Sequence, residues 1–507
     1  MPDLSRLSGA LAPIEVRSEA RSRRSRWGVS RLSFRTAAIA VMALASALAV
    51  PASSSAGGPG VWTKLATVRA PDTAGMLRSA SGTLHLVWLK PRASNNTDSY
   101  GTSAISLAGK LLATGTALSN WATLEPDPRL VRDGSAFRLI FEGNTGSSGC
   151  FADGAVFTET SPNGSTWSLV QGSLSQHTAG VGNLAATTES NGITPVAAFA
   201  GGHLFHVGVD PTCPASSPDG TITPTPASDS QSFPAIVTNS HDGSVWVAWY
   251  QAFTKQGYWV ERILPSQGPP IEAPGSKATP AENNQPLEPV ALAARAGGGV
   301  YMAYCTSTSA QQCAHIDLWK VGSSTAKVVP GSRNTTGARV ALAAAPQGRL
   351  WVSWYNEAKN AIHAVRTNTA GTSFGPVRST KPPAHTSGVF ALQAQASSGR
   401  VDLIINDQLS TTGFPNVLFH TQILPGLSLR AKPASFSHRK AKKVTFTVGE
   451  AGQPVAAATV SCLGKKGKTA ANGQIKLRFH KGRAVGKHVC TAAKSGYNGG
   501  KTTIKVT

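Results

Sequence analysis

Residues 338–356 read ARVALAAAPQGRLWVSWYN, and the pattern in this stretch gives the clearest indication of the fold. Apolar side chains alternate with smaller ones from Val340 to Ala344, a Pro-Gln-Gly turn follows, and alternation resumes from Leu350 to Trp354. A period of two residues on both sides of a turn that contains glycine is typical of an antiparallel β-hairpin. The stretch therefore predicts two paired strands, each with one face toward a core.

The same unit recurs along the chain. Its turn glycines are spaced by 52, 58, 51, 55, 50 and 51 residues, and they are Gly82, Gly134, Gly192, Gly243, Gly298, Gly348 and Gly399. Repeats of about fifty residues with strand-type patterning predict a β-propeller in which each repeat forms one four-stranded blade. We therefore predict an all-β chain in which residues 57–425 form a seven-bladed propeller, with six blades as the alternative count.

The last repeat lacks one strand. It supplies strands near 389–395, 401–406 and 416–424, after which the composition changes. A lone strand pattern, VWTKLATV at residues 61–68, precedes the first hairpin. Because closing the ring removes exposed sheet edges, we expect residues 61–68 to form the outer strand of the last blade.

Charge divides the 507-residue chain into three parts. Residues 1–56 carry a net charge of +5, residues 57–425 carry +2, and residues 426–507 carry +16, from 17 Lys or Arg and one acid. A field of that strength attracts polyanions. The candidate polyanion-binding residues are Arg439, Lys440, Lys442, Lys443, Lys465, Lys466 and Lys468.

Two interpretations of this basic tail stay open. It could attach the protein to anionic cell-wall polymers, lipid headgroups or nucleic acid, or it could be a solvated surface that aids solubility. The near-absence of acids, with Glu450 as the single one, favours a polyanion partner. Specific nucleic-acid binding is disfavoured, because aromatic residues are not interleaved with the basic clusters.

The N-terminus has the pattern of a secretory signal. An Arg-rich leader precedes a 14-residue apolar run at residues 37–50, and small-residue cleavage sites follow at Ala52 and Ala56. The run is shorter than the roughly 20 residues of a membrane-spanning helix. We therefore expect a secreted or cell-surface protein, with contact to the membrane only if the signal stays uncleaved.

Cysteine usage agrees with export. None of the six cysteines has the spacing of a zinc site, so we expect no metal and no cofactor. An even number in an exported chain indicates disulfides, although free buried thiols are the alternative. The expected pairs are Cys462 with Cys490, Cys305 with Cys313 and, by elimination, Cys150 with Cys213.

Two loops resemble a known propeller family. Residues 161–167 (SPNGSTW) and 367–374 (TNTAGTSF) resemble the Asp-box turn, or BNR repeat, of sialidase-like propellers, with Asn163 and Thr369 at the position of the Asp. The resemblance covers roughly residues 60–425. It implies the propeller fold, because the Asp box is a folding element in that family and has no catalytic role.

The tail resembles a different kind of domain. The run GQPVAAATV at residues 452–460 and the Asn472-Gly473 turn are similar to the prealbumin-like or Ig-like sandwich of secreted bacterial proteins, including the carboxypeptidase regulatory-like domain. That resemblance implies a non-catalytic accessory module. We expect a signal region at 1–56, the propeller at 57–425 and a basic β-sandwich at 426–507.

The resemblance to sialidase-like propellers also indicates where a ligand would bind. In that arrangement, the loops that leave each second strand and enter each first strand converge above the central channel. Aromatic faces beside amide and carboxylate groups suit sugar rings, while packing between blades is the alternative role. The candidate ligand-binding residues at the ends of the second strands are Trp88, Glu142, Tyr250, Tyr304, Tyr355 and Asp407.

A sialidase would need three arginines, a tyrosine nucleophile with a glutamate partner, and an aspartate acid. The family's Arg-Ile-Pro motif is not found, and the spacing of Arg138, Arg262 and Arg339 does not show that they converge. Catalytic residues therefore stay unassigned. We expect a propeller that binds glycans and a basic accessory domain that holds cell-wall polyanions, with a sialidase-type glycoside hydrolase and a structural envelope protein as alternatives.

Overall fold

The structure of the protein is a computed structural model. It describes residues 59–69, 73–144, 155–170, 182–192, 195–200, 204–206, 220–222, 231–251, 257–276, 290–309, 312–336, 338–383, 388–409 and 416–507. The regular elements in these ranges are strands and two 3-10 turns, η2 (Pro346–Gly348) and η3 (Glu357–Lys359). No helix of the described ranges is long and apolar enough to cross a membrane. The predicted signal at 1–56 lies outside the described residues.

The stretch at residues 338–356 forms the predicted hairpin. Strand β24 (Arg339–Ala345) pairs antiparallel with β25 (Arg349–Asn356), and Leu342 stands opposite Val352. The turn between the strands places Gln347 and Gly348 at positive φ, 65° and 75°, a conformation that glycine adopts without steric cost. The same sheet continues through β26 (Ala361–Arg366) and β27 (Arg378–Thr380).

Three further sheets before residue 276 follow the repeat. The first contains β2 (Gly75–Arg78), β3 (Leu84–Leu89), β4 (Asp98–Ile105) and β5 (Leu111–Trp121). The second contains β6 (Thr123–Leu124), β7 (Arg129–Asp133), β8 (Ala136–Asn144), β9 (Ala155–Ser161) and β10 (Ser168–Leu169). The fourth repeat gives β15 (Gln231–Thr238), β16 (Val245–Gln251), β17 (Gly257–Leu264) and β18 (Ile271–Glu272).

The remaining repeats differ in how much of them is described. The fifth contains β19 (Ala291–Ala294), β20 (Val300–Ser309), β21 (Gln312–Lys320), β22 (Ala326–Val328) and β23 (Thr335–Thr336). The third is described as two separate pairs, β11 (Gly182–Thr188) with β12 (Pro195–Ala200) and β13 (Leu204–His206) with β14 (Gly220–Ile222). The propeller architecture is therefore clear, while the count of seven blades stays a prediction.

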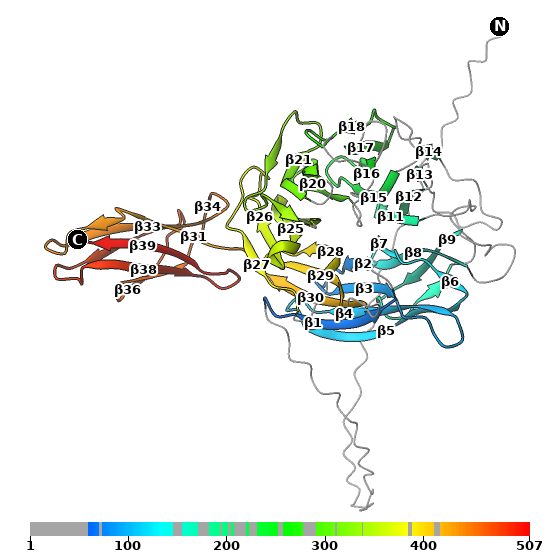
Figure 1. Cartoon of the computed structure of the whole chain (residues 1–507), viewed down its shortest axis with the longest axis horizontal. Helices are drawn as coiled ribbons and strands as arrows, with labels where there is room; N and C mark the ends of the chain where they lie inside the picture. The colour runs from blue at the N-terminus through cyan, green and yellow to red at the C-terminus, as the bar shows by residue number, and fades with distance from the viewer. Residues whose placement is uncertain are drawn as a thin grey trace, which may run out of the picture. The chain divides into compact units, whose positions relative to one another are not determined.

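The predicted ring closure is confirmed. Strand β1 (Thr63–Val68) pairs antiparallel with β30 (Asn416–Ile423), which continues to β29 (Val401–Gln408) and β28 (Gly388–Ala396). The buried clusters lie between neighbouring sheets, so that the sheets follow one another around a ring (Figure 1). Burial of apolar surface between sheets, at roughly 25 cal/mol per Å², thus holds the first and last repeats together.

Residues 426–507 form two sheets with one shared core. The first contains β31 (Ser428–Lys432), β33 (Lys442–Glu450), β34 (Gln453–Pro454) and β37 (Gln474–Phe479). The second contains β32 (Ser435–Phe436), β39 (Gly500–Val506), β38 (Gly486–Ala493), β35 (Thr459–Cys462) and β36 (Lys465–Lys468). Phe446 and Phe479 of the first sheet share a buried cluster with Val460 and Ile504 of the second.

Two of the predicted disulfides are confirmed. Cys305 is bonded to Cys313 across β20 and β21, and Cys462 is bonded to Cys490 across β35 and β38. The second bond closes a loop with a sequence separation of 28 residues, and a loop of that size contributes about 3 kcal/mol in the chain-entropy account. The third pair, Cys150 with Cys213, lies outside the described residues.

The turns that resemble Asp boxes are organised by asparagine. After β9, Oδ1 of Asn163 accepts hydrogen bonds from the backbone N–H groups of Ser165 and Thr166, both at 2.9 Å. After β26, the corresponding acceptor is Asn368, whose Oδ1 lies 2.7 Å from the backbone nitrogen of Thr372. An amide oxygen therefore does what a carboxylate oxygen would do, and Thr369 does not take that role.

Candidate functional site

The six candidate ligand-binding residues lie on the second strands of their sheets, as the repeat predicted. The structure buries all of them, with exposed fractions of 0% to 6%. Their strands β3, β8, β16, β20, β25 and β29 are each covered by neighbouring sheets. This burial favours the alternative role in packing between blades and leaves no open aromatic platform among these six side chains.

The contacts of the aromatic residues explain their burial. Trp88 lies against Gly101, where an added methyl group would stand 2.7 Å from Cε2 of the indole. The ring of Tyr258 lies between the other two tyrosines. Its centroid is 5.0 Å from that of Tyr250 and 5.6 Å from that of Tyr304. The hydroxyl of Tyr304 donates to the carbonyl oxygen of Pro274 at 2.6 Å. A buried hydroxyl with a partner is packed and is not free to act as a nucleophile.

The two acids of the set also lie in the interior. Burial, with a smaller contribution from Glu125, raises the pKa of Glu142 to about 8. Burial alone raises the pKa of Asp407 to about 7. Neither carboxylate oxygen of Asp407 has a hydrogen-bond partner in the described part of the chain. The pKa of Tyr355 is also raised, chiefly by burial and to a smaller extent by the charges of Glu357 and Asp407.

The candidate arginines of a sialidase do not gather at one place. Arg138 donates to Asp133 at 2.8 Å, beside the turn of the β7–β8 hairpin. Arg262 donates to the carbonyl oxygen of Ser266. Arg339 donates to the carbonyl oxygen of Phe390 at 2.8 Å and lies at the end of the β24–β25 hairpin away from its turn. Each guanidinium thus has its own local partner.

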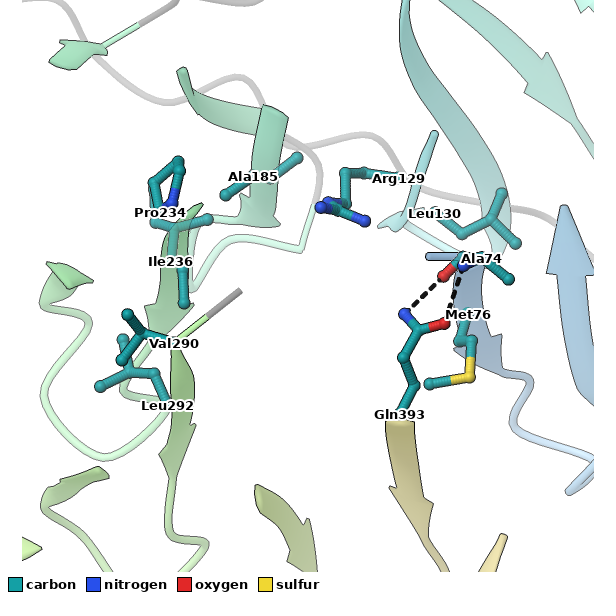
Figure 2. Close-up of a pocket in the computed structure, with 12 residues that line it drawn as sticks. Ala74, Met76, Arg129, Leu130, Ala185, Pro234, Ile236, Val290, Leu292 and Gln393 are labelled. Carbon is teal, nitrogen blue, oxygen red and sulfur yellow. Dashed lines mark hydrogen bonds between the residues drawn. The ribbon is translucent and has the colours of Figure 1, made fainter. Parts of the chain in front are cut away.

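A pocket of about 270 Å³ lies where the first strands of several sheets meet (Figure 2). Polar atoms contribute more of the surface exposed in the pocket than apolar atoms do, although ten of its twelve lining residues are apolar. The apolar residues include Ala74, Met76, Leu130, Ile236, Val290 and Leu292. Because these side chains come from β2, β7, β15 and β19 or from the residues that directly precede β2 and β19, the pocket occupies the central channel of the propeller.

Two polar side chains, Arg129 and Gln393, line the same pocket. Arg129 donates to the hydroxyl of Thr73 at 2.7 Å and to the carbonyl oxygen of Leu184 at 2.6 Å. Its Nη2 atom has no hydrogen-bond partner among the described residues and lies 3.8 Å from Oδ1 of Asp127. Figure 2 shows this guanidinium directed into the opening between the sheets.

The sequence analysis missed this pocket because it took its candidate residues from the ends of the second strands, whereas the first strands line the pocket. Gln393 is held by Ala74, whose N–H donates to Oε1 at 2.7 Å and whose carbonyl oxygen accepts from Nε2 at 2.8 Å. The polar residues at inward positions of otherwise apolar first strands were the available signal. Their convergence depends on closure of the ring, which brings β28 beside β2.

The predicted basic residues are distributed over both sheets of the C-terminal unit. Arg439 and Lys440 precede β33, whereas Lys442 and Lys443 begin it. Lys465, Lys466 and Lys468 form β36 in the other sheet. The two clusters therefore belong to different sheets.

Register adds basic residues that the clusters did not include. Lys443 stands directly opposite Arg478 on β37, and Lys487 on β38 stands directly opposite Lys505 on β39. Like charges in this position destabilise a sheet. The sequence signal was the spacing of basic residues by two or four positions, which places them on one side of a strand, in KLR (residues 476–478) and KTTIK (residues 501–505).

The single acid of residues 426–507, Glu450, is paired with arginines of the propeller. Glu450, 1% exposed, accepts hydrogen bonds from Nε and Nη2 of Arg366 on β26, both at 2.6 Å. Nη1 of Arg349 lies 3.4 Å from the same carboxylate. This carboxylate joins the C-terminal sheets to the sheet of β24–β27 and does not offset the exposed lysines.

No family model and no curated protein matches the chain. Solved structures do match: a Trypanosoma rangeli sialidase at 11% identity and a TM-score of 0.38, and the Aleuria aurantia lectin AAL at 10% and 0.35. The β-propeller domain of the Trilobed protease from Pyrococcus furiosus matches at 7% and 0.35. These matches cover 70%, 79% and 70% of this chain and 53%, 96% and 96% of the respective partners. The match spans about half of the sialidase chain.

Proposed function

We propose that this protein is a secreted or cell-surface binding protein. Residues 57–425 form a seven-bladed propeller that binds carbohydrate, and residues 426–507 form a prealbumin-like or Ig-like sandwich that attaches to an anionic polymer. The observation that carries the proposal is the charge of the C-terminal sheets. Exposed lysines stand opposite one another in register, and the only nearby acid is buried against Arg366.

The unfavourable arrangement of these charges supports a polyanion partner. Cross-strand like charges cost stability, and a solubility role would be served equally well by lysines that alternate with acids. An anionic polymer would neutralise both members of each pair. Two disulfides support an extracellular location, because disulfides persist in oxidising compartments.

Attachment predicts strong dependence on salt. We expect the full chain to bind polyphosphate-coated beads at low ionic strength and to elute as salt rises, because exposed charges are screened over about 8 Å at physiological salt and about 3 Å at 1 M. A six-fold Lys→Gln variant should elute at lower salt. Its positions are Lys440, Lys442, Lys443, Lys465, Lys466 and Lys468.

A matched control removes the same charge from the propeller. Changing six propeller lysines to Gln should leave the elution salt nearly unchanged. The positions are Lys64, Lys90, Lys110, Lys327, Lys359 and Lys381. Equal shifts in the two variants would show that net charge alone acts, and no binding by the parent would support a structural envelope protein.

Carbohydrate binding is proposed at the central pocket rather than at the six buried residues. Its volume of about 270 Å³ lies just below the range of about 300 to 1,000 Å³ of small-molecule sites, which favours a single sugar ring. Apolar side chains suit the C–H face of a ring, and Nη2 of Arg129, which has no hydrogen-bond partner among the described residues, can donate to a hydroxyl. Catalysis is not proposed, because the candidate tyrosines are buried and the described arginines are separately engaged.

We expect Arg129→Gln to weaken monosaccharide binding at least tenfold, since a hydrogen bond from a charged group contributes about 1.5 to 3 kcal/mol. Calorimetric titration of the monosaccharides selected on a glycan array measures the change. Arg132→Gln on the same strand β7, at an exposed position, is the matched control. Equal affinities of both variants would contradict a role for the pocket.

A further inference from the structure

The two sheets of the C-terminal unit each present a basic outer surface. On the β31–β33–β37 sheet, Val444, Phe446, Leu477 and Phe479 alternate inward to the shared core. The residues between them face outward. The surface named here face one consists of the exposed side chains Arg430, Lys432, Lys443, Lys476 and Arg478.

The second sheet follows the same rule on the opposite side of the core. Val460, Cys490, Ala492 and Ile504 alternate inward. The surface named here face two consists of the exposed side chains Lys466, Lys468, Lys487, Lys501 and Lys505. Since side chains of successive residues point to opposite sides of a strand, the two faces are directed away from each other.

Nothing described in the protein neutralises either face. None of these ten side chains makes an ion pair among the described residues. On face one, Lys443 is directly opposite Arg478, and on face two Lys487 is directly opposite Lys505. Each face therefore contains at least one pair of positive charges that an external anion would relieve.

We propose that each face binds one chain of a linear phosphate polyanion, so that one protein molecule bridges two chains. The inference rests on the proposed attachment to an anionic polymer. Opposite residues have Cβ atoms about 4.5 to 5.5 Å apart, and each internal phosphate of a linear polymer keeps two non-bridging oxygens, so one phosphate can accept hydrogen bonds from both members of a pair. Eight of the ten cationic residues are lysine, whose ammonium group is a point charge without the fixed fork of arginine, which suits a flexible polymer.

Two bound chains would not exclude each other. Packed sheets are separated by about 10 Å between backbones, and the outward lysine side chains add to that separation. The screening length at physiological salt is about 8 Å. Repulsion between polymer chains on the two faces is therefore largely screened, and the faces act as independent sites.

Bridging is tested with the full chain and long-chain inorganic polyphosphate. Polyphosphate-coated beads take up the protein at sub-saturating density, are washed, and receive a fluorescent second polyphosphate chain. The face-one variant carries Lys443→Gln, Lys476→Gln and Arg478→Gln. The face-two variant carries Lys487→Gln, Lys501→Gln and Lys505→Gln.

We expect the parent to capture the labelled chain. Each single-face variant should still bind the beads, with affinity lowered several-fold, while capture of the second chain falls at least tenfold. Circular dichroism and a cooperative thermal transition like that of the parent show that the variant is folded. The combined six-fold variant should bind the beads most weakly and capture no second chain, and millimolar inorganic phosphate should compete far less than polymer at equal phosphate concentration.

The outcomes separate this inference from the proposed function. Beads that hold the parent but never capture a second chain would refute bridging and leave attachment standing. Single-face variants that capture as well as the parent would also refute it. A parent that does not bind polyphosphate beads, or binds only anionic phospholipid vesicles, would overturn attachment to a phosphate polymer itself.

Discussion

Replacing Glu450 with alanine is expected to destabilise the protein by about 3 to 5 kcal/mol and to release residues 426–507 from the sheet of β24–β27. The Glu450 carboxylate, 1% exposed, bonds both Nε and Nη2 of Arg366 at 2.6 Å. Arg349 lies 3.4 Å away. Removing one partner of a buried pair leaves an uncompensated buried charge, which costs about 3 to 5 kcal/mol.

Neighbouring contacts indicate why this junction unfolds as a unit. The guanidinium of Arg366 lies over Trp351 at 5.6 Å and over Tyr497 of the C-terminal unit at 5.8 Å. Gln453 accepts from Arg349 at 2.6 Å and donates to Thr369 at 2.9 Å. Loss of Glu450 would leave these groups around two arginines that repel each other.

Urea unfolding and limited proteolysis between the two units measure the effect. The variant should unfold at a lower urea concentration than the parent. Protease should cleave it near residues 424–427, between the two units. Glu357→Ala in the exposed turn η3 is the matched control and should change stability by less than about 0.5 kcal/mol. A difference of under 1 kcal/mol between the two variants would contradict the role of Glu450.

Stability is also expected to fall as pH rises from about 4.5 to about 8, chiefly because of buried carboxyl groups. Glu159 on β9 is 3% exposed, and Oε2 has no hydrogen-bond partner in the described ranges. Burial raises the pKa of Glu159 from its ordinary value of 4.5 to about 8. Glu142 behaves in the same way, with burial and Glu125 as causes of its raised pKa.

The sign follows from proton binding. Below pH 4.5 both the folded and the unfolded chain hold the proton, so the contribution of Glu159 to stability is full. Above pH 4.5 the unfolded chain releases the proton while the folded chain keeps it, and stability declines until pH passes about 8. Since one pKa unit corresponds to about 1.4 kcal/mol, the loss for this group is at most about 5 kcal/mol.

Glu159→Gln tests this directly. The amide has nearly the same shape and no charge to bury, so the variant should be more stable than the parent by a few kcal/mol at pH 8.5 and about equal at pH 4.5. Denaturant unfolding at a series of pH values measures both differences. Glu357→Gln, at an exposed position, should follow the parent at every pH. A variant that keeps the parental slope between pH 4.5 and pH 8 would rule out Glu159 as its source.

The repeat and the closing strand could be predicted because they depend on local alternation. Val340 and Leu342 alternate with smaller residues because the two sides of their strand pack against different neighbouring sheets, and the structure pairs them with Trp354 and Val352. The closing strand β1 followed from counting strands against a fixed repeat. Both disulfides of the described chain followed from proximity in sequence or from a shared domain.

The candidate site was predicted less well for an equally physical reason. Position at the end of a second strand was correct for Tyr250 and Tyr304, but exposure depends on the neighbouring sheet, which local sequence does not specify. Tyr258 and the carbonyl group of Pro274 fill the space around them. The sequence alone therefore supplied residue types suited to sugars and not their accessibility.

The all-β propeller repeat, the strand that closes it and the dense positive charge of the tail all follow from the amino-acid sequence. The positions of those charges follow from the pairing of strands, because register sets Lys443 against Arg478 and Lys487 against Lys505 on opposite surfaces. The bond between Glu450 and Arg366, which is 84 positions away in the chain, likewise depends on the tertiary structure. Alternation within a strand records what is buried. Partners between strands depend on how the whole chain closes, and no local pattern encodes that.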